Sequence, residues 1–404
     1  MRISNALARG CIIAISICMT WIACSSSVSA TPMIALKESQ NCAGCHKPGR
    51  SELPVLERRC TLDCVGCHID PAGGGARNAW GNYYQNDQLS PINFIKPIDP
   101  LQDKSYADIH LDSRIISRQV SDSTRTYPMS NELTLRVRPL VEYLHFTYSA
   151  LLFGRVGDKS VRALRSDHRR FREKYSLMVD QLPLGSYARW YRGAPMYGIR
   201  RPNHTLWIRE RIGLDQFAMT EAIEVGGTPT VPFIRGSQMT GDPYQLPEDR
   251  QKGTSFHGGL RGVTAGWHLN SSYWSTESTK KKVDMTAFGA GLSPWDFLIY
   301  GERNWRAVQD KEIQNYSALE SLADHTQPSS VISEYTAAFA GIPGVIFGYV
   351  HEELQDSNTD SMRRNIFVDF HPLPGIQFEI WRRFESGSRR LADNVGIFHL
   401  YGDF

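Results

Sequence analysis

Cysteine is almost absent from this chain outside one short stretch. The sequence has 404 residues and eight cysteines, and five of the eight lie between Cys42 and Cys67. The 337 residues that follow Cys67 contain none, so disulfide bonds cannot hold the bulk of the protein together. Such clustering indicates one local cofactor module near the N-terminus.

An excess of charge of either sign is also missing. The 45 Lys and Arg residues nearly balance the 42 Asp and Glu residues, which argues against nucleic acid as a partner. No Ser-His-Asp, phosphate-loop or dinucleotide motif stands out. We therefore expect an electron carrier or conduit that works through its cofactor, rather than an enzyme with a substrate pocket.

Long hydrophobic runs are lacking after the first 30 residues. The mean hydropathy of −0.36 excludes a polytopic helical membrane protein. It does not exclude a membrane β-barrel, because a barrel strand alternates lipid-facing and lumen-facing residues.

Residues 1–30 have the features of an export signal. Arg2 and Arg9 precede an apolar run from Cys11 to Cys24, and the small residues Val28-Ser29-Ala30 suit cleavage after Ala30. A lipoprotein that begins at a lipidated Cys24 is the alternative. Either reading predicts an exported protein.

Two Cys-x-x-Cys-His motifs lie within 27 residues, at Cys42–His46 and at Cys64–His68. The two thiols of such a motif form thioethers with one porphyrin, and the adjacent histidine ligates the iron. We therefore predict two haem c groups, attached through Cys42, Cys45, Cys64 and Cys67, with His46 and His68 as axial iron ligands. A four-cysteine zinc site is the alternative, but it leaves both histidines without a role.

The surroundings of the motifs are less informative. Cys60 is left over, and a packed free thiol is a simpler interpretation than a redox or metal role. Arg77, after a glycine-rich turn, is a candidate contact for a haem propionate. The sixth iron ligands cannot be read from the sequence, although Met33 and His110 are nearby candidates.

Beyond residue 105 the sequence changes to period-two alternation, which is typical of β-strands. Short turns rich in Pro or Gly recur and are separated by longer polar stretches. The expected turns are Arg138–Glu142, Leu182–Gly185, Gly262–Gly266, Ser293–Asp296, Gly341–Gly344, Pro372–Gly375 and, more weakly, Leu214–Phe217. The expected long loops are Val156–Glu173, Arg235–Gly253 and Val308–Ser330.

Short turns at one end and long loops at the other are typical of outer-membrane barrels. With an opening strand near Ile109–Ser121 and a closing strand at Val395–Phe404, the pattern predicts about 16 antiparallel strands and both termini in the periplasm. Chain-final Phe404 resembles the C-terminal signal of such barrels, although Gly402 stands where an aromatic is usual. A soluble all-β sandwich is the alternative, because period two alone does not say which face is outside.

The whole layout resembles the fused cytochrome–porin proteins of the bacterial outer membrane. This resemblance implies three parts: a signal peptide (1–30), a small, mostly α or irregular dihaem cytochrome c module with its linker (31–105), and an outer-membrane β-barrel (106–404). It also implies electron transfer across the membrane, with the haem module on the periplasmic side or within the lumen. A periplasmic electron-transfer protein, an extracellular acceptor or donor and outer-membrane lipid are the partners that it implies.

Two alternative functions remain open from the sequence: a haem enzyme of the peroxidase type, and a solute channel with a haem-containing plug or sensor.

One cationic segment, Arg200–Arg211, is a candidate lining of the barrel lumen. Period-two parity groups Arg209 and Arg211 with Trp207, opposite Ile208 and Ile212, which predicts lumen-facing arginines. Solvated lumen charge is the simple interpretation, and a lining for haem propionates is the other.

The motifs predict a covalent haem count of two. The intact mass of the mature protein should exceed that of the polypeptide by two haems, and Cys45→Ala should remove one attachment. His68→Ala should alter the spectrum of the second haem. A single haem, or bound zinc, would contradict the prediction.

Overall fold

A computed structural model describes the chain from residue 106 to residue 403. The description omits residues 121–122, 141–142, 157–158, 161–172, 184–185, 195, 199–205, 213–218, 228–231, 262–266, 295, 311–325, 343, 357–358 and 387–390. Of the N-terminal part it describes Asp70, Arg77 and Gly81. The two haem motifs and Phe404 lie outside the described residues.

The described chain is almost entirely β-structure. Its strands are β1 (Ala107–Val120), β2 (Ser123–Leu140), β3 (Leu144–Val156), β4 (Lys159–Ser160), β5 (Glu173–Leu182), β6 (Ser186–Gly193), β7 (Thr220–Gly227), β8 (Pro232–Gly241), β9 (Lys252–Arg261), β10 (His268–Glu277), β11 (Lys281–Leu292), β12 (Phe297–Asp310), β13 (Thr326–Ile342), β14 (Val345–Asp356), β15 (Thr359–Leu373), β16 (Ile376–Ser386) and β17 (Leu391–Asp403). One short helix, α5 (Trp207–Glu210), lies in the connection between β6 and β7.

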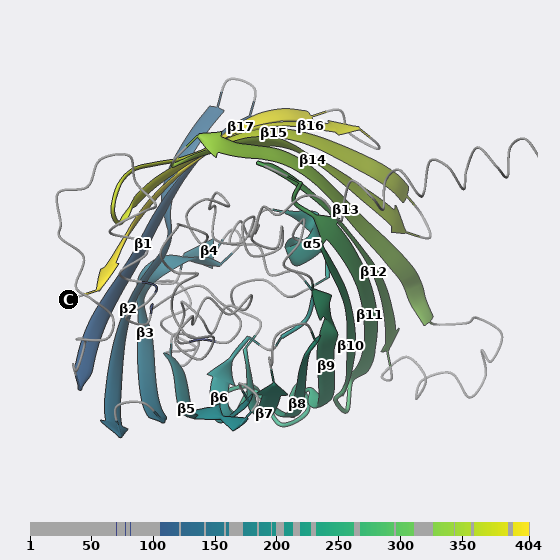
Figure 1. Ribbon diagram of the computed structural model, residues 1–404. Helices are drawn as coiled ribbons and strands as arrows, with labels where there is room; N and C mark the ends of the chain where they lie inside the picture. Colours follow the sequence, from purple (N-terminus) through teal and green to yellow (C-terminus); the bar gives the residue numbers. More distant parts are fainter. Residues whose placement is uncertain are drawn as a thin grey trace, which may run out of the picture.

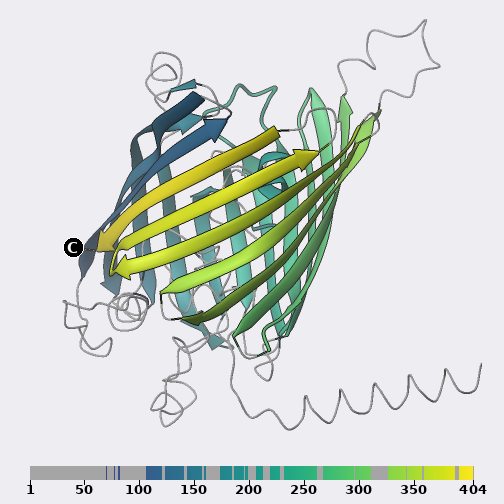
Figure 2. The ribbon, with the colours of Figure 1, turned by 90° about the horizontal axis from the view of Figure 1, so that it is seen from above.

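The strands close into a single antiparallel barrel. Each long strand pairs with its neighbours in sequence, and β1 pairs with both β2 and β17. The two-residue strand β4 pairs with β3, and the wall continues directly from β3 to β5, so 16 of the 17 strands form the wall. Figure 1, seen into the barrel, shows this ring with α5 inside it, and Figure 2 shows the tilt of the strands. The predicted strand number and closure are confirmed.

Both ends of the described barrel chain lie at the same end of the barrel, which we call the terminal end. Its turns join β2–β3, β5–β6, β7–β8, β9–β10, β11–β12, β13–β14 and β15–β16. Six of these turns fall where the sequence predicted them. The seventh predicted turn, Leu214–Phe217, lies outside the described residues, between β6 and β7. The seventh strand pair that meets at the terminal end is β7, which ends at Gly227, and β8, which begins at Pro232.

The long connections lie at the end opposite the termini, as expected. Those between β3 and β5 and between β12 and β13 match the predicted positions. The prediction for Arg235–Gly253 was partly wrong, because β8 continues to Gly241 and β9 begins at Lys252. In β8 the polar residues Arg235 and Ser237 face the lumen and alternate with residues that face outward. The polar sequence of this segment therefore comes from a lumen-facing strand and not from a loop.

Side chains divide cleanly between the two faces of the wall. The outer face carries the exposed large apolar residues, for example Ile223 and Val225 (both 58% exposed), Ile366 (55%) and Ile380 (62%). The inner face carries buried polar residues. An apolar outer face suits lipid and contradicts the soluble sandwich, whose outer face would be polar. Among the described residues, no helix has the length and apolar character needed to cross a bilayer.

An outward cation near the middle of a strand should destabilise the inserted barrel. Ile366→Arg, in the middle of β15, should lower the free energy of unfolding by about 2–4 kcal/mol, because the side chain lies in the hydrocarbon region. Leu182→Arg, beside the β5–β6 turn, is the control and should cost about 0–1 kcal/mol. Urea titration of the barrel in lipid vesicles measures both. Equal costs at the two positions would contradict a lipid-facing wall.

Candidate functional site

Arginine and histidine side chains gather inside the barrel at the terminal end. Each lies within five residues of the end of its strand there. We call this set the Arg/His belt: Arg136 and Arg138 on β2, Arg189 on β6, Arg235 on β8, Arg261 on β9, His110 on β1, His145 on β3, His257 on β9, His268 on β10, His371 on β15 and His399 on β17. All except His399 are at most 9% exposed. The sequence alone indicates no role for these residues, apart from His110 as a candidate iron ligand.

The lumen wall is divided by charge. Among the described side chains, six buried arginines lie on β2–β9, and five of the six belong to the belt. On β12–β16 the buried charges are mainly acidic: Glu302, Glu334, Glu352, Asp369 and Glu379, against Arg363 and Arg383. An anionic group that enters from the terminal end therefore meets a cationic wall on one side.

Arg189 is the centre of a buried polar network in the belt. Its guanidinium pairs with Glu224 on β7 at 3.0 Å and lies 3.9 Å from the centre of the Tyr191 ring. Tyr187 and Ser237 donate to the same carboxylate at 2.7 and 2.9 Å. Glu224 is 0% exposed, and these donors offset the free energy of desolvating its buried carboxylate.

Arg189 also binds the N-terminal part of the chain. Its Nη1 donates to the Asp70 carboxylate at 2.8 Å. Glu224 neutralises one side of the guanidinium and Asp70 the other. Asp70 therefore docks against β6 on the lumen face, near the terminal end.

Arg77 makes a second contact with the lumen wall. Its guanidinium carbon lies 4.6 Å from the centre of the Tyr401 ring on β17, and Arg77 is 7% exposed. Tyr401 in turn lies beside His399, with ring centres 4.5 Å apart. The predicted role of Arg77 as a propionate contact stays a prediction. The geometry adds that residues 70 and 77, which follow the second haem motif, reach two separate parts of the wall.

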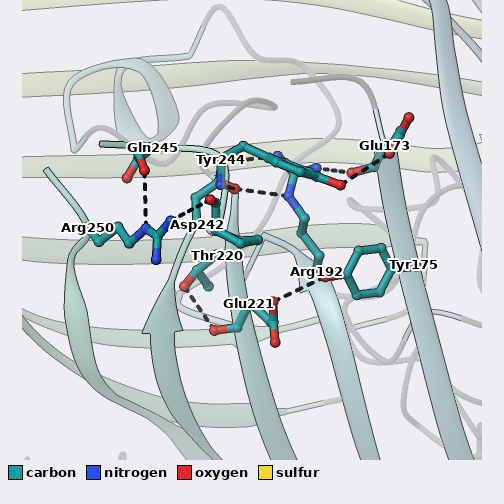
Figure 3. A network of polar contacts seen from close by, with 10 residues as sticks. Glu173, Tyr175, Arg192, Thr220, Glu221, Asp242, Tyr244, Gln245 and Arg250 are labelled. Carbon is teal, nitrogen blue, oxygen red and sulfur yellow. Dashed lines mark hydrogen bonds and ion pairs between the residues drawn. The ribbon is translucent and has the colours of Figure 1, made fainter. Parts of the chain in front are cut away.

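A different network joins strands and loop at the opposite end. Arg192 on β6 makes a two-pronged pair with Asp242, with both N–O distances 3.0 Å, and lies 4.5 Å from the Tyr244 ring centre (Figure 3). Tyr244 donates to Glu173 at 3.3 Å. Burial, then the Glu173 carboxylate, raises the pKa of Tyr244, so the phenol stays a donor at neutral pH. This network fixes the β8–β9 loop to β5 and β6.

The helix α5 is anchored in the lumen through one carboxylate. Glu352 on β14 accepts the Trp207 backbone N–H at 2.5 Å and pairs with Arg363 at 2.6 Å. Arg363 also lies over the Trp207 ring, 4.7 Å from its centre. Trp207 is 1% exposed.

The helix corrects the expectation for the cationic segment. Period-two parity does not apply to a helix, in which residues three and four apart share a face. Trp207, Ile208 and Arg209 are all buried, whereas Arg211 is exposed, so Arg209 and Arg211 do not form the predicted pair of lumen-facing arginines. Residues 200–205 lie outside the described chain.

No family model matches the sequence, and no curated protein matches it either. Solved structures do resemble the barrel. A loop-deletion mutant of the outer-membrane protein OmpT of Vibrio cholerae superposes with a TM-score of 0.53 at 8% identity, over 73% of this chain and 99% of that one. The outer-membrane expressed OmpT of the same organism gives 0.50 at 10% identity, over 73% and 97%.

An anion-selective porin from Comamonas acidovorans gives a TM-score of 0.50 at 8% identity, over 74% of this chain and 98% of that one. Identities this low show the fold alone. The chain is thus a porin-like, 16-stranded outer-membrane barrel, as the sequence predicted. The predicted attachment cysteines (Cys42, Cys45, Cys64 and Cys67) and the predicted iron ligands (His46 and His68) lie outside the described residues, so their roles stay predictions.

Glu352 should hold α5 in place inside the lumen. Glu352→Gln removes the charge that faces Arg363 and weakens the bond to the Trp207 N–H, at a cost of about 1–3 kcal/mol. We expect faster proteolysis in the β6–β7 connection and an altered Trp emission. Glu353→Gln is the matched control, because that side chain faces outward and contacts His351. Equal effects of the two variants would contradict the anchoring role.

Proposed function

We propose that this protein carries electrons across the bacterial outer membrane through two c-type haems held at the terminal end of the barrel lumen. One observation carries the proposal: the chain that follows the second Cys-x-x-Cys-His motif contacts the lumen wall at Asp70 and Arg77. A porin-like barrel gives the insulated passage, and the motifs give the redox groups.

Chain length ties the second motif to the wall. His68 precedes Asp70 by two residues, and two extended residues span about 7 Å. Asp70 is held by Arg189 on β6, so a haem attached at Cys64 and Cys67 belongs near this wall. The first motif lies 24 residues before Asp70, which leaves it free to reach any part of the terminal end.

The belt suits the chemistry of the haem edge. Haem propionates are anions, and arginine matches a carboxylate with two parallel N–H donors. Arg189 is taken up by Glu224 and Asp70, and Arg136 by Asp108, so Arg138, Arg235 and Arg261 are the belt arginines that would meet the propionates. Cys42, Cys45, Cys64 and Cys67 would form the thioethers, and His46 and His68 would hold the irons. The haem supplies one-electron redox chemistry when bound.

Aromatic side chains continue from the belt into the lumen. Tyr191, Tyr197, Trp207 and Trp274 belong to one buried cluster, in which Tyr197 and Trp274 meet edge to face at 6.3 Å. Two haems at one end leave part of the membrane thickness uncovered. These rings, or an extracellular partner, would complete the path. A periplasmic electron-transfer protein and an extracellular acceptor or donor are the partners that the proposal requires.

A solute channel with a haem-containing plug is the second candidate, and the porin-like fold is the observation that favours it. The two proposals differ in what passes through the lumen. Liposome swelling with small sugars or anions tests for solute flow, and electron transfer is tested separately.

The decisive experiment uses proteoliposomes with oriented protein and a redox dye trapped inside. We expect an impermeant external acceptor to oxidise the dye with the native protein, and to do so more slowly by at least about tenfold with His46→Ala or His68→Ala, because an altered iron site raises the barrier to electron transfer. Glu353→Gln, on the outer face, serves as the control.

The conduit is contradicted if the native protein passes no electrons, or if both histidine variants pass them at the native rate. Rapid swelling without electron transfer would instead favour the channel.

A further inference from the structure

We infer that His268, at the start of β10, is the axial iron ligand that the barrel wall supplies to one of the two haems. The inference rests on the proposed function and adds the residue that completes one iron site. It also gives a reason for a buried imidazole whose ring nitrogens have no hydrogen-bond partner among the described residues.

His268 sits in a row of four residues that face the lumen. Cross-strand pairing places Arg261, His268, Gly291 and Tyr300 side by side on β9, β10, β11 and β12. Gly291 has no side chain, so the His268 ring reaches across it and stacks on Tyr300, with ring centres 5.2 Å apart and planes at 13°. A Cβ on Gly291 would lie 2.7 Å from Cε1 of His268. The row therefore fixes the orientation of the imidazole.

The ring nitrogens of His268 are buried without a polar partner. The residue is 1% exposed, and neither nitrogen has a hydrogen-bond partner in the part of the chain that the structure describes. A buried polar group without a partner costs about 1–3 kcal/mol and calls for a reason. Coordination of a metal through one nitrogen would supply it.

Three other histidines of the belt have a hydrogen-bond partner on one ring nitrogen. His257 bonds Ser272 at 2.7 Å, and His399 bonds Gln377 at 2.8 Å. His371 lies 3.4 Å from the Tyr401 hydroxyl. Among the described residues His145 also lacks a hydrogen bond, but its Nε2 is 3.9 Å from the Asp180 carboxylate.

The location suits an iron that arrives already held by a porphyrin. Among the described residues, no three His, Cys, Asp or Glu side chains converge on a metal position, so His268 would not bind a free ion well. A six-coordinate haem iron takes one ligand besides its proximal histidine. Arg261, next to His268 in the row, places a cation beside the ligand, where a propionate would lie.

The test uses purified full-length protein and compares His268→Ala with His257→Ala. Both residues are buried belt histidines on adjacent strands. The His257 ring has a hydrogen bond to Ser272, whereas the His268 ring has none among the described residues. For His268→Ala we expect two covalent haems by mass, loss of about half of the low-spin ferric EPR signal and a new high-spin signal, since one of two irons loses a ligand. Added imidazole should restore the low-spin signal. His257→Ala should resemble the native protein.

Two further variants guard against a misfolded alanine variant. His268→Met should keep one iron six-coordinate and raise its reduction potential. Gly291→Ala should displace the ring and weaken the same low-spin signal, whereas Gly396→Ala, with nothing within 4 Å of the added Cβ, should not.

Unchanged spectra for His268→Ala and His268→Met, in protein that carries two haems, would overturn the inference and leave the proposed function standing. A native protein without covalent haem would overturn the proposed function itself.

Discussion

The closure of the sheet is the constraint on which the rest of the structure depends. In hydrocarbon, an unpaired backbone N–H or C=O costs several kcal/mol, so a membrane sheet cannot keep an open edge. Pairing of β1 with β17, in register from His110 opposite Asp403 to Val120 opposite Asp393, removes the last edge. Closure also assigns every strand residue to lipid or to lumen, because successive side chains point to opposite faces.

That assignment places many charged side chains inside the lumen, where buried ion pairs neutralise them. Arg189 with Glu224, Arg192 with Asp242 and Arg363 with Glu352 are buried pairs in which each partner keeps further donors or acceptors. Removing one member of such a pair would leave a buried charge, which is why these networks hold loops and α5 in fixed positions. These pairs therefore hold Asp70, the loop of Asp242 and helix α5 against the lumen wall.

The Arg/His belt makes the two ends of the lumen chemically different. Its arginines and histidines lie where the chain from the N-terminal part meets the barrel, and Asp70 and Arg77 bind there. The opposite end is held instead by the network of Arg192, Asp242 and Tyr244 (Figure 3). A cofactor module carried by residues 31–105 would thus meet cations and imidazoles first. Its redox groups would sit at one end of an insulated passage, with aromatic rings beyond them.

The sequence by itself determined the strand pattern, the strand number and six of the seven short turns, because period two and Pro- or Gly-containing turns are local signals. It also identified the two Cys-x-x-Cys-His motifs, whose spacing carries their chemistry. It could not reveal the row of Arg261, His268, Gly291 and Tyr300, since cross-strand register brings together residues 39 positions apart. Nor could parity foresee α5, because the capture of Trp207 by Glu352 is a contact between residues 145 apart in the chain. Long-range pairing, which only the closed barrel creates, decided both.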